Sequence, residues 1–160
     1  MSLQLMKTRH KPLEEKRSVM GYVILTIQLI VAGIAGALIY LIGALILRYA
    51  WKMIIPVGTG GFLLSLAEVV LEGLVAVPGG LVCGSIAGIN CKREHIMDFG
   101  IISGMLMFVL SSLLLLIAAM VFNLNALANV YFYVGLCLMF MLGIIASVAG
   151  VSFSSRITVK

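Results

Sequence analysis

Glu68 and Glu72 are the residues with the clearest potential for chemistry, and they are the only charged residues between Lys52 and Lys92. Because they are four residues apart, a helix places them one turn apart on the same face. Two nearby carboxylates in a low dielectric resist double ionisation, so the pair could hold and exchange one proton or bind a cation. Their spacing therefore raises the hypothesis of a proton or cation site.

A stripe of small and polar residues contains these glutamates. At helical spacing it comprises Gly61, Ser65, Glu68, Glu72, Ala76, Gly79, Cys83, Ala87 and Asn90. The large aliphatic residues of the segment fall on other faces, and an ionised carboxylate in hydrocarbon is costly. We therefore expect the stripe to face the rest of the protein, a partner protein or a water-filled cavity.

A structural role is the alternative interpretation of the same glutamates. Arg48 or Lys52 could pair with them, and the Tyr40 hydroxyl could hydrogen-bond to them. A third arrangement places residues 62–77 at the membrane interface, with both glutamates in water. We favour a structural or partner-binding role over transport. The candidate ion, proton or partner-binding site comprises Glu68, Glu72, Ser65, Tyr40 and Arg48.

Glycines four residues apart form a second pattern. Gly80, Gly84 and Gly88 form GxxxGxxxG about 100° around the helix from the glutamates, and Gly100 and Gly104 form GxxxG in the next apolar segment. Small residues at this spacing let helix backbones approach closely. The pattern predicts helix–helix contacts at these glycines, within a bundle or in an oligomer.

The elements that position these residues must lie in a membrane. Of the 160 residues, 62% are hydrophobic and 11% are charged, too few charges to cover a water-facing surface. Eleven of the seventeen charged residues lie in the short segments 7–17 and 92–98. The apolar stretches between them reach the roughly 20 residues that a bilayer-spanning helix needs. The sequence therefore predicts an all-α integral membrane protein.

Four spans account for these stretches, which gives a four-helix transmembrane bundle. The spans are expected at about 19–47, 62–90, 99–122 and 130–152, within a single transmembrane domain at 18–155 that lies between a basic tail at 1–17 and a short tail at 156–160. The first span follows a charged tail and is too long for a signal-peptide core, so we expect it to be retained. Aromatic and basic residues from Arg48 to Lys52 are expected to anchor its end at the interface.

Residues 53–91 admit two arrangements. In the first, 53–61 form an interfacial loop and 62–90 form one span that is kinked at Pro78-Gly79-Gly80. In the second, the segment breaks at Pro78 into two short spans, giving five in all. Four spans place nine Lys and Arg residues on one side and two on the other, whereas five spans divide them five against six. The positive-inside rule favours four spans, with both termini in the cytoplasm.

Other chemistry has little support in the sequence. Cys83 and Cys91 are about 12 Å apart along one helix, too far for a disulfide. Cys91 and His95 form only half of a metal-ligand pattern, and no nucleophile or phosphate-binding motif is present. We therefore expect no metal, no cofactor, no nucleic acid and no enzymatic activity.

The leading hypothesis is a non-catalytic membrane subunit or scaffold that contacts other membrane proteins, or its own copies, through the second span. The alternative is a small proton- or cation-coupled transport or channel component that uses Glu68 and Glu72.

Overall fold

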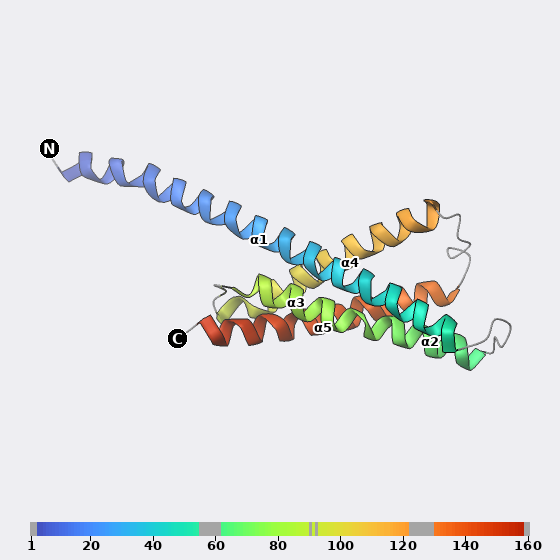
Figure 1. The fold of residues 1–160 in the computed structure, drawn as a ribbon. Coiled ribbons are helices and arrows are strands. Elements are labelled where there is room, and N and C mark those ends of the chain that lie inside the picture. Colours follow the sequence, from blue (N-terminus) through green and yellow to red (C-terminus); the bar gives the residue numbers. More distant parts are fainter. Residues whose placement is uncertain (1–2, 55–61, 90, 92, 122–129, 159–160) are drawn as a thin grey trace.

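The computed structural model is helical throughout its regular elements in the part of the chain that it describes (Figure 1). In chain order the elements are α1 (Leu3–Ile54), α2 (Phe62–Leu74), α3 (Ala76–Ala87), the 3-10 helix η1 (Arg93–His95), α4 (Ile96–Val121) and α5 (Val130–Thr158). The structure describes residues 3–54, 62–89, 91, 93–121 and 130–158, although it describes no side chain for 3–20, 62–65, 93, 118–119, 121, 130–131 and 158.

Four segments of these helices are long and apolar enough to cross a bilayer. They are Gly21–Ile54, Leu66–Ala87, Ile96–Ile117 and Phe132–Ile157. In a bilayer core every backbone polar group must be satisfied internally, which is why such segments are helical. The prediction of an all-α, four-helix transmembrane bundle is confirmed. The second span combines α2 and α3, so the five-span alternative does not apply.

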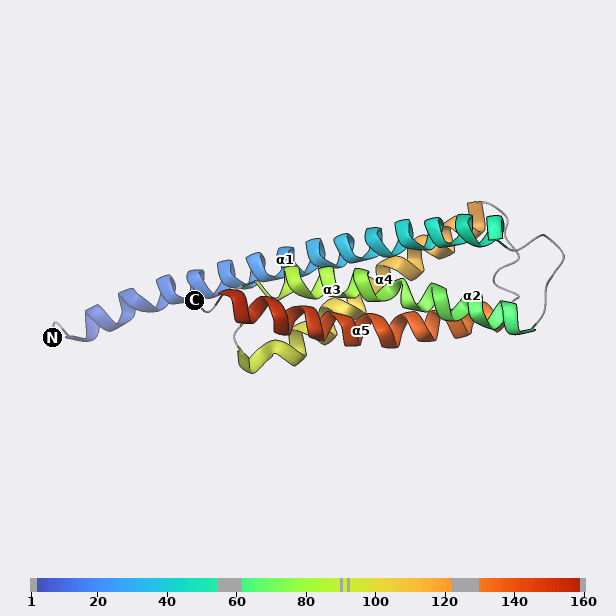
Figure 2. The ribbon, with the colours of Figure 1, turned by 60° about the horizontal axis from the view of Figure 1, so that its bottom comes forward.

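The interruption of the second span lies at Val75, not at the predicted Pro78-Gly79-Gly80. Proline lacks a backbone N–H and its ring crowds the carbonyl four residues earlier, which here belongs to Leu74. The disturbance therefore appears one turn before Pro78. The Val75 amide still donates to the Leu71 carbonyl at 3.2 Å, so α2 and α3 continue in nearly the same direction (Figure 2).

The helices extend beyond several of the predicted span ends. α1 continues through the Arg48–Lys52 anchor to Ile54, two residues before Pro56, whose ring disfavours helix in the residue before it. α5 begins at the predicted residue and continues to Thr158. Residues 55–61 of the predicted interfacial loop and the asparagine-rich turn at 123–129 lie outside the described residues.

The second span lies at the centre of the bundle. α3 packs against α1, α4 and α5, and α2 packs mainly against α5. Figures 1 and 2 show both chain termini at the same end of the molecule, with the amino-terminal part of α1 projecting beyond the other helices. They also show α4 diverging from α5 toward the opposite end.

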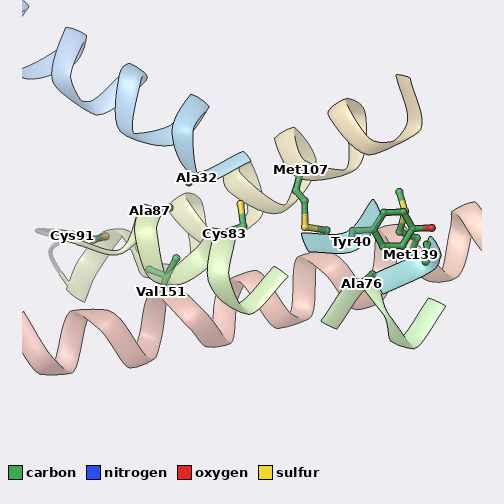
Figure 3. Close-up of a cluster of buried hydrophobic side chains, with 10 residues drawn as sticks. Ala32, Tyr40, Ala76, Cys83, Ala87, Cys91, Met107, Met139 and Val151 are labelled. Atoms are coloured by element: carbon green, nitrogen blue, oxygen red, sulfur yellow. The ribbon is translucent and has the colours of Figure 1, made fainter. Parts of the chain in front are cut away.

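The core consists mostly of small side chains (Figure 3). Its buried members include alanines and cysteines from α1, α3 and the segment after α3, together with Met107, Met139 and Val151. Ala76, Gly79, Cys83 and Ala87 of the predicted stripe are all buried, so this part of the stripe faces the bundle. Small residues let the helices approach closely. The van der Waals packing that results is a source of attraction between helices in lipid.

Candidate functional site

An ion pair between Arg48 of α1 and Glu72 of α2 is the centre of the candidate site. The Arg48 Nε lies 2.7 Å from the Glu72 Oε1, and this bond crosses between the first and second spans. The Glu72 side chain is 19% exposed and the Arg48 side chain is 46% exposed. Of the two cations considered from the sequence, Arg48 makes this contact.

The other predicted site residues, Glu68, Tyr40 and Ser65, differ in how they are placed relative to this ion pair. Glu68 lies one turn before Glu72 on α2, is half-buried, and is close enough to act electrostatically on Arg48. Tyr40 is buried, and among the described residues no hydrogen bond joins it to either glutamate. Ser65 belongs to α2, but its side chain is outside the described part of the structure.

A cavity of about 490 Å³ adjoins the ion pair. It lies where α4 diverges from α5, and its polar lining consists of Tyr40, Arg48 and Glu72. Its apolar lining is larger and comes from α1, α4 and α5. The structure thus brings three of the predicted site residues to one cavity, which can accept a molecule that is partly polar and partly apolar.

The GxxxGxxxG glycines lie against α5 of the same chain. A Cβ atom added to Gly80 would lie 2.5 Å from the Gly143 carbonyl oxygen, and one added to Gly84 would overlap the Ser147 carbonyl. A Cβ atom added to Gly88 would lie 2.9 Å from the Val151 Cα. At all three positions the backbones are too close for a side chain.

The remaining predicted glycines also contact α5. A Cβ atom on Gly100 would lie 2.6 Å from the Val148 Cα, and one on Gly104 would lie 2.8 Å from the Ile144 Cα. α5 is therefore the common partner of both glycine motifs. Its own small residues, which the sequence analysis did not identify, include Gly143, Ser147 and Gly150, and their four- and three-residue spacing was the available signal.

Gln28 is a structural residue that the sequence analysis missed. Its Nε2 donates to the carbonyl oxygens of Ile86 at 2.7 Å, Ala87 at 3.2 Å and Ile89 at 2.8 Å. Carbonyls at a helix end have no partner within the helix and are costly to leave unpaired in lipid. The signal for this role was a single amide side chain within an apolar span.

A polar contact that the sequence analysis also missed joins α3, α4 and α5. The hydroxyl oxygens of Ser103 and Ser147 are 2.7 Å apart, and both residues are fully buried. The Cys83 thiol donates to the Ser103 carbonyl oxygen at 3.2 Å. These bonds tie three spans together at the middle of the bundle, next to the Gly84 contact.

The four apolar spans and the interior polar contacts between them define the class of this protein. It is a multi-pass α-helical membrane protein, and its described residues form one four-helix bundle in contact with lipid. Comparisons with protein-family models, with curated proteins and with solved structures gave no match to the chain.

Proposed function

We propose that this chain is a non-catalytic membrane subunit or scaffold that contacts other membrane proteins through the outward face of its second span. The observation that supports this most is that interior polar side chains form hydrogen bonds between spans. Arg48 bonds to Glu72, Gln28 bonds to the end of α3, and Ser103 bonds to Ser147. Polar side chains that hold spans together suit a structural component better than a reaction centre.

The face of the second span that remains for a partner is apolar. The glycine motif is covered by α5, and the Ala76, Gly79, Cys83 and Ala87 part of the small-residue stripe is covered by the bundle. The exposed residues at helical spacing are Leu66, Val70, Leu74 and Leu81. Because α2 and α3 continue in nearly the same direction, a partner helix would pack along this face.

Photo-crosslinking in native membranes tests this proposal. A photoreactive amino acid at Val70 or Leu81 is expected to give a crosslinked protein of defined mass, while the same amino acid at Val109 on exposed α4 serves as the control. Protein crosslinks confined to Val70 and Leu81 would support the outward face of the second span as the contact. Crosslinks to lipid alone at all three positions would rule it out.

The cavity beside Glu72 supports a second candidate function, a small proton- or cation-coupled transport or channel component. Glu72 lines this cavity and Glu68 lies one turn away, so an ion in the cavity would meet a carboxylate. Protonation of Glu72 would weaken its bond to Arg48, which gives a coupling between proton uptake and the contact of α1 with α2.

Flux measurements in liposomes separate the two functions. Glu68→Gln and Glu72→Gln are expected to lower proton or cation flux if the carboxylates carry it, while Glu94→Gln, which changes an exposed residue outside the spans, is the matched control. Equal flux in the parent and all three variants would exclude the transport function and leave the scaffold function in place.

A further inference from the structure

We propose that the cavity between α1, α2, α4 and α5 binds one phospholipid that has a zwitterionic headgroup. The headgroup would contact Arg48, Glu72 and Tyr40, and one acyl chain would lie against the apolar walls from α4 and α5. This site is separate from the outward face of the second span, so it goes beyond the proposed scaffold function.

The shape and lining of the cavity fit an amphipathic ligand. Its volume of about 490 Å³ lies within the range of roughly 300–1,000 Å³ that is usual for small-molecule sites. Leu115, Phe132 and Leu136 provide apolar walls, while the polar groups come from α1 and α2. A ligand with polar and apolar parts can match both sides at once.

The position of the cavity makes a lipid the available occupant. Leu45 of α1 and Leu114 of α4 both line the cavity, yet these residues are 68% and 40% exposed on the apolar surface of the bundle. The cavity therefore reaches the lipid-facing surface between these two helices. A bilayer lipid can enter from the side without passing through water.

The charges at the cavity favour a headgroup that has both signs. Arg48 and Glu72 carry opposite charges, and Glu68, one turn before Glu72, also acts electrostatically on Arg48, so an anionic headgroup would be poorly compensated in this low dielectric. The bond between them uses one of the five N–H donors of Arg48 and one of the two oxygens of Glu72. A lipid phosphate can accept from the Nη atoms of Arg48 while a lipid ammonium donates to Glu72.

Tyr40 of α1 also lines the cavity. The residue is only 5% exposed. A phenolic hydroxyl can both donate and accept a hydrogen bond. An ester or phosphate oxygen of the lipid would accept a hydrogen bond from it.

Native mass spectrometry of the detergent-solubilised protein tests the proposal. The protein is equilibrated with equal amounts of a phosphoethanolamine lipid and a phosphoglycerol lipid that have the same acyl chains. We expect one retained lipid per chain, with a preference of about tenfold for the zwitterionic lipid, because the anionic lipid brings an uncompensated charge. Equal retention of both lipids, a preference for the anionic one, or no retained lipid would overturn the proposal.

A cavity-filling variant shows where the lipid binds. Gly135 lines the cavity, and a Cβ atom there would meet only Val69 Cγ1, at 3.8 Å, so Gly135→Leu is expected to fit and to lower retention about tenfold. Gly21→Leu is the matched control, since no atom lies within 4 Å of its added Cβ, and it should retain lipid like the parent. Unchanged retention in Gly135→Leu would place the lipid elsewhere and contradict the proposal.

The double variant Arg48→Gln/Glu72→Gln provides the second measurement. It tests lipid binding at the cavity independently if Gly135→Leu proves unstable. It removes both charges of the ion pair but keeps the cavity. We expect it to lose the preference for the zwitterionic lipid, and a preserved preference would show that the ion pair does not contact the headgroup.

Discussion

Gly84 of α3 lies directly on the backbone of Ser147 of α5, so that any side chain at Gly84 would overlap the Ser147 carbonyl. The two central helices are thus in backbone contact at the level where the Ser103 and Ser147 hydroxyls meet. Close contact of this kind provides dispersion attraction between helices that hydrophobic burial does not provide in lipid.

Gly84→Ala is expected to destabilise the bundle by about 1–3 kcal/mol, because α3 and α5 must separate to admit the methyl group. The control is Gly135→Ala in α5, where the new Cβ would have its nearest neighbour at 3.8 Å. There the better helix propensity of alanine should stabilise by up to about 1 kcal/mol. Thermal unfolding in detergent measures the stability of both variants. A change of the same sign in Gly84→Ala and Gly135→Ala would contradict the close contact between Gly84 and Ser147.

Ser103→Ala and Ser111→Ala are expected to differ, although both serines are fully buried on α4. The Ser103 hydroxyl bonds to Ser147, so its loss should cost about 0.6 kcal/mol, the average for such bonds in membranes, and at most about 1.7 kcal/mol. The Ser111 hydroxyl has no hydrogen-bond partner among the described residues, so its removal should be neutral or stabilising. Unfolding in mixed micelles compares them, and an equal loss would argue against the Ser103–Ser147 bond.

Gln28→Leu is expected to loosen the end of α3, because it removes the donor for three carbonyl oxygens. The Ile86 carbonyl keeps the Ile89 amide as a donor, so the loss falls mainly on the carbonyl of buried Ala87. An unsatisfied buried acceptor costs about 1–3 kcal/mol, so the melting temperature should fall. Thr26→Val is the control, since Thr26 lies on the same helix and bonds only within it, to the Tyr22 carbonyl. Faster hydrogen exchange at Ile89 and Cys91 would locate the loosening at the end of α3. Unchanged exchange there would contradict a stabilising role of the Gln28 hydrogen bonds.

Arg48→Gln and Glu72→Gln are each expected to destabilise, because each leaves the other charge without its partner. Loss of one partner from a fully buried pair costs about 3–5 kcal/mol, and the partial exposure of both side chains reduces this to about 1–3 kcal/mol here. The double variant should recover part of the loss. A double-mutant cycle measures this coupling, and strictly additive effects would mean that the ion pair contributes nothing.

Cys91 is expected to react slowly with a maleimide near neutral pH. Burial, and secondly the charge of Asp98, raise the pKa of its thiol above the ordinary value near 9. Since the thiolate is the reactive form, the labelling rate should keep rising beyond pH 9. Asp98→Asn should shift the profile to lower pH, because it removes one cause of the raised pKa. Peptide mapping identifies the labelled residue, and a profile that levels off below pH 9 would contradict this prediction.

The sequence was sufficient for the fold because each span is set by its own length and apolarity. The second span needed the charge distribution as well, and the four-span arrangement that the charges favoured is the one in the structure. The predicted position of the interruption in the second span was wrong. The Pro78 ring disturbs the helix at the Leu74 carbonyl, one turn before the proline itself.

The contacts between spans were harder to predict. Residue spacing indicated that Glu72 faces away from lipid, but the choice of Arg48 as its partner depends on how α1 and α2 are rotated. The Gln28 and Ser103–Ser147 bonds join residues 58 and 44 positions apart, and no local pattern marks such pairs. Local periodicity identifies the inner face of a helix, whereas the packed structure decides which residues meet there.

α1 has a further consequence for the membrane in which this protein lies. Its span of 34 residues includes the Arg48–Lys52 anchor, and the apolar part from Gly21 to Leu47 is about 40 Å long, compared with about 33–39 Å for the other three spans and roughly 30 Å for an average hydrocarbon core. Such hydrophobic mismatch makes a helix tilt or the surrounding bilayer thicken, at a cost that grows with the difference. The length of α1 therefore favours thick bilayers over thin ones, and lipid thickness becomes a factor that sorts this protein among membranes.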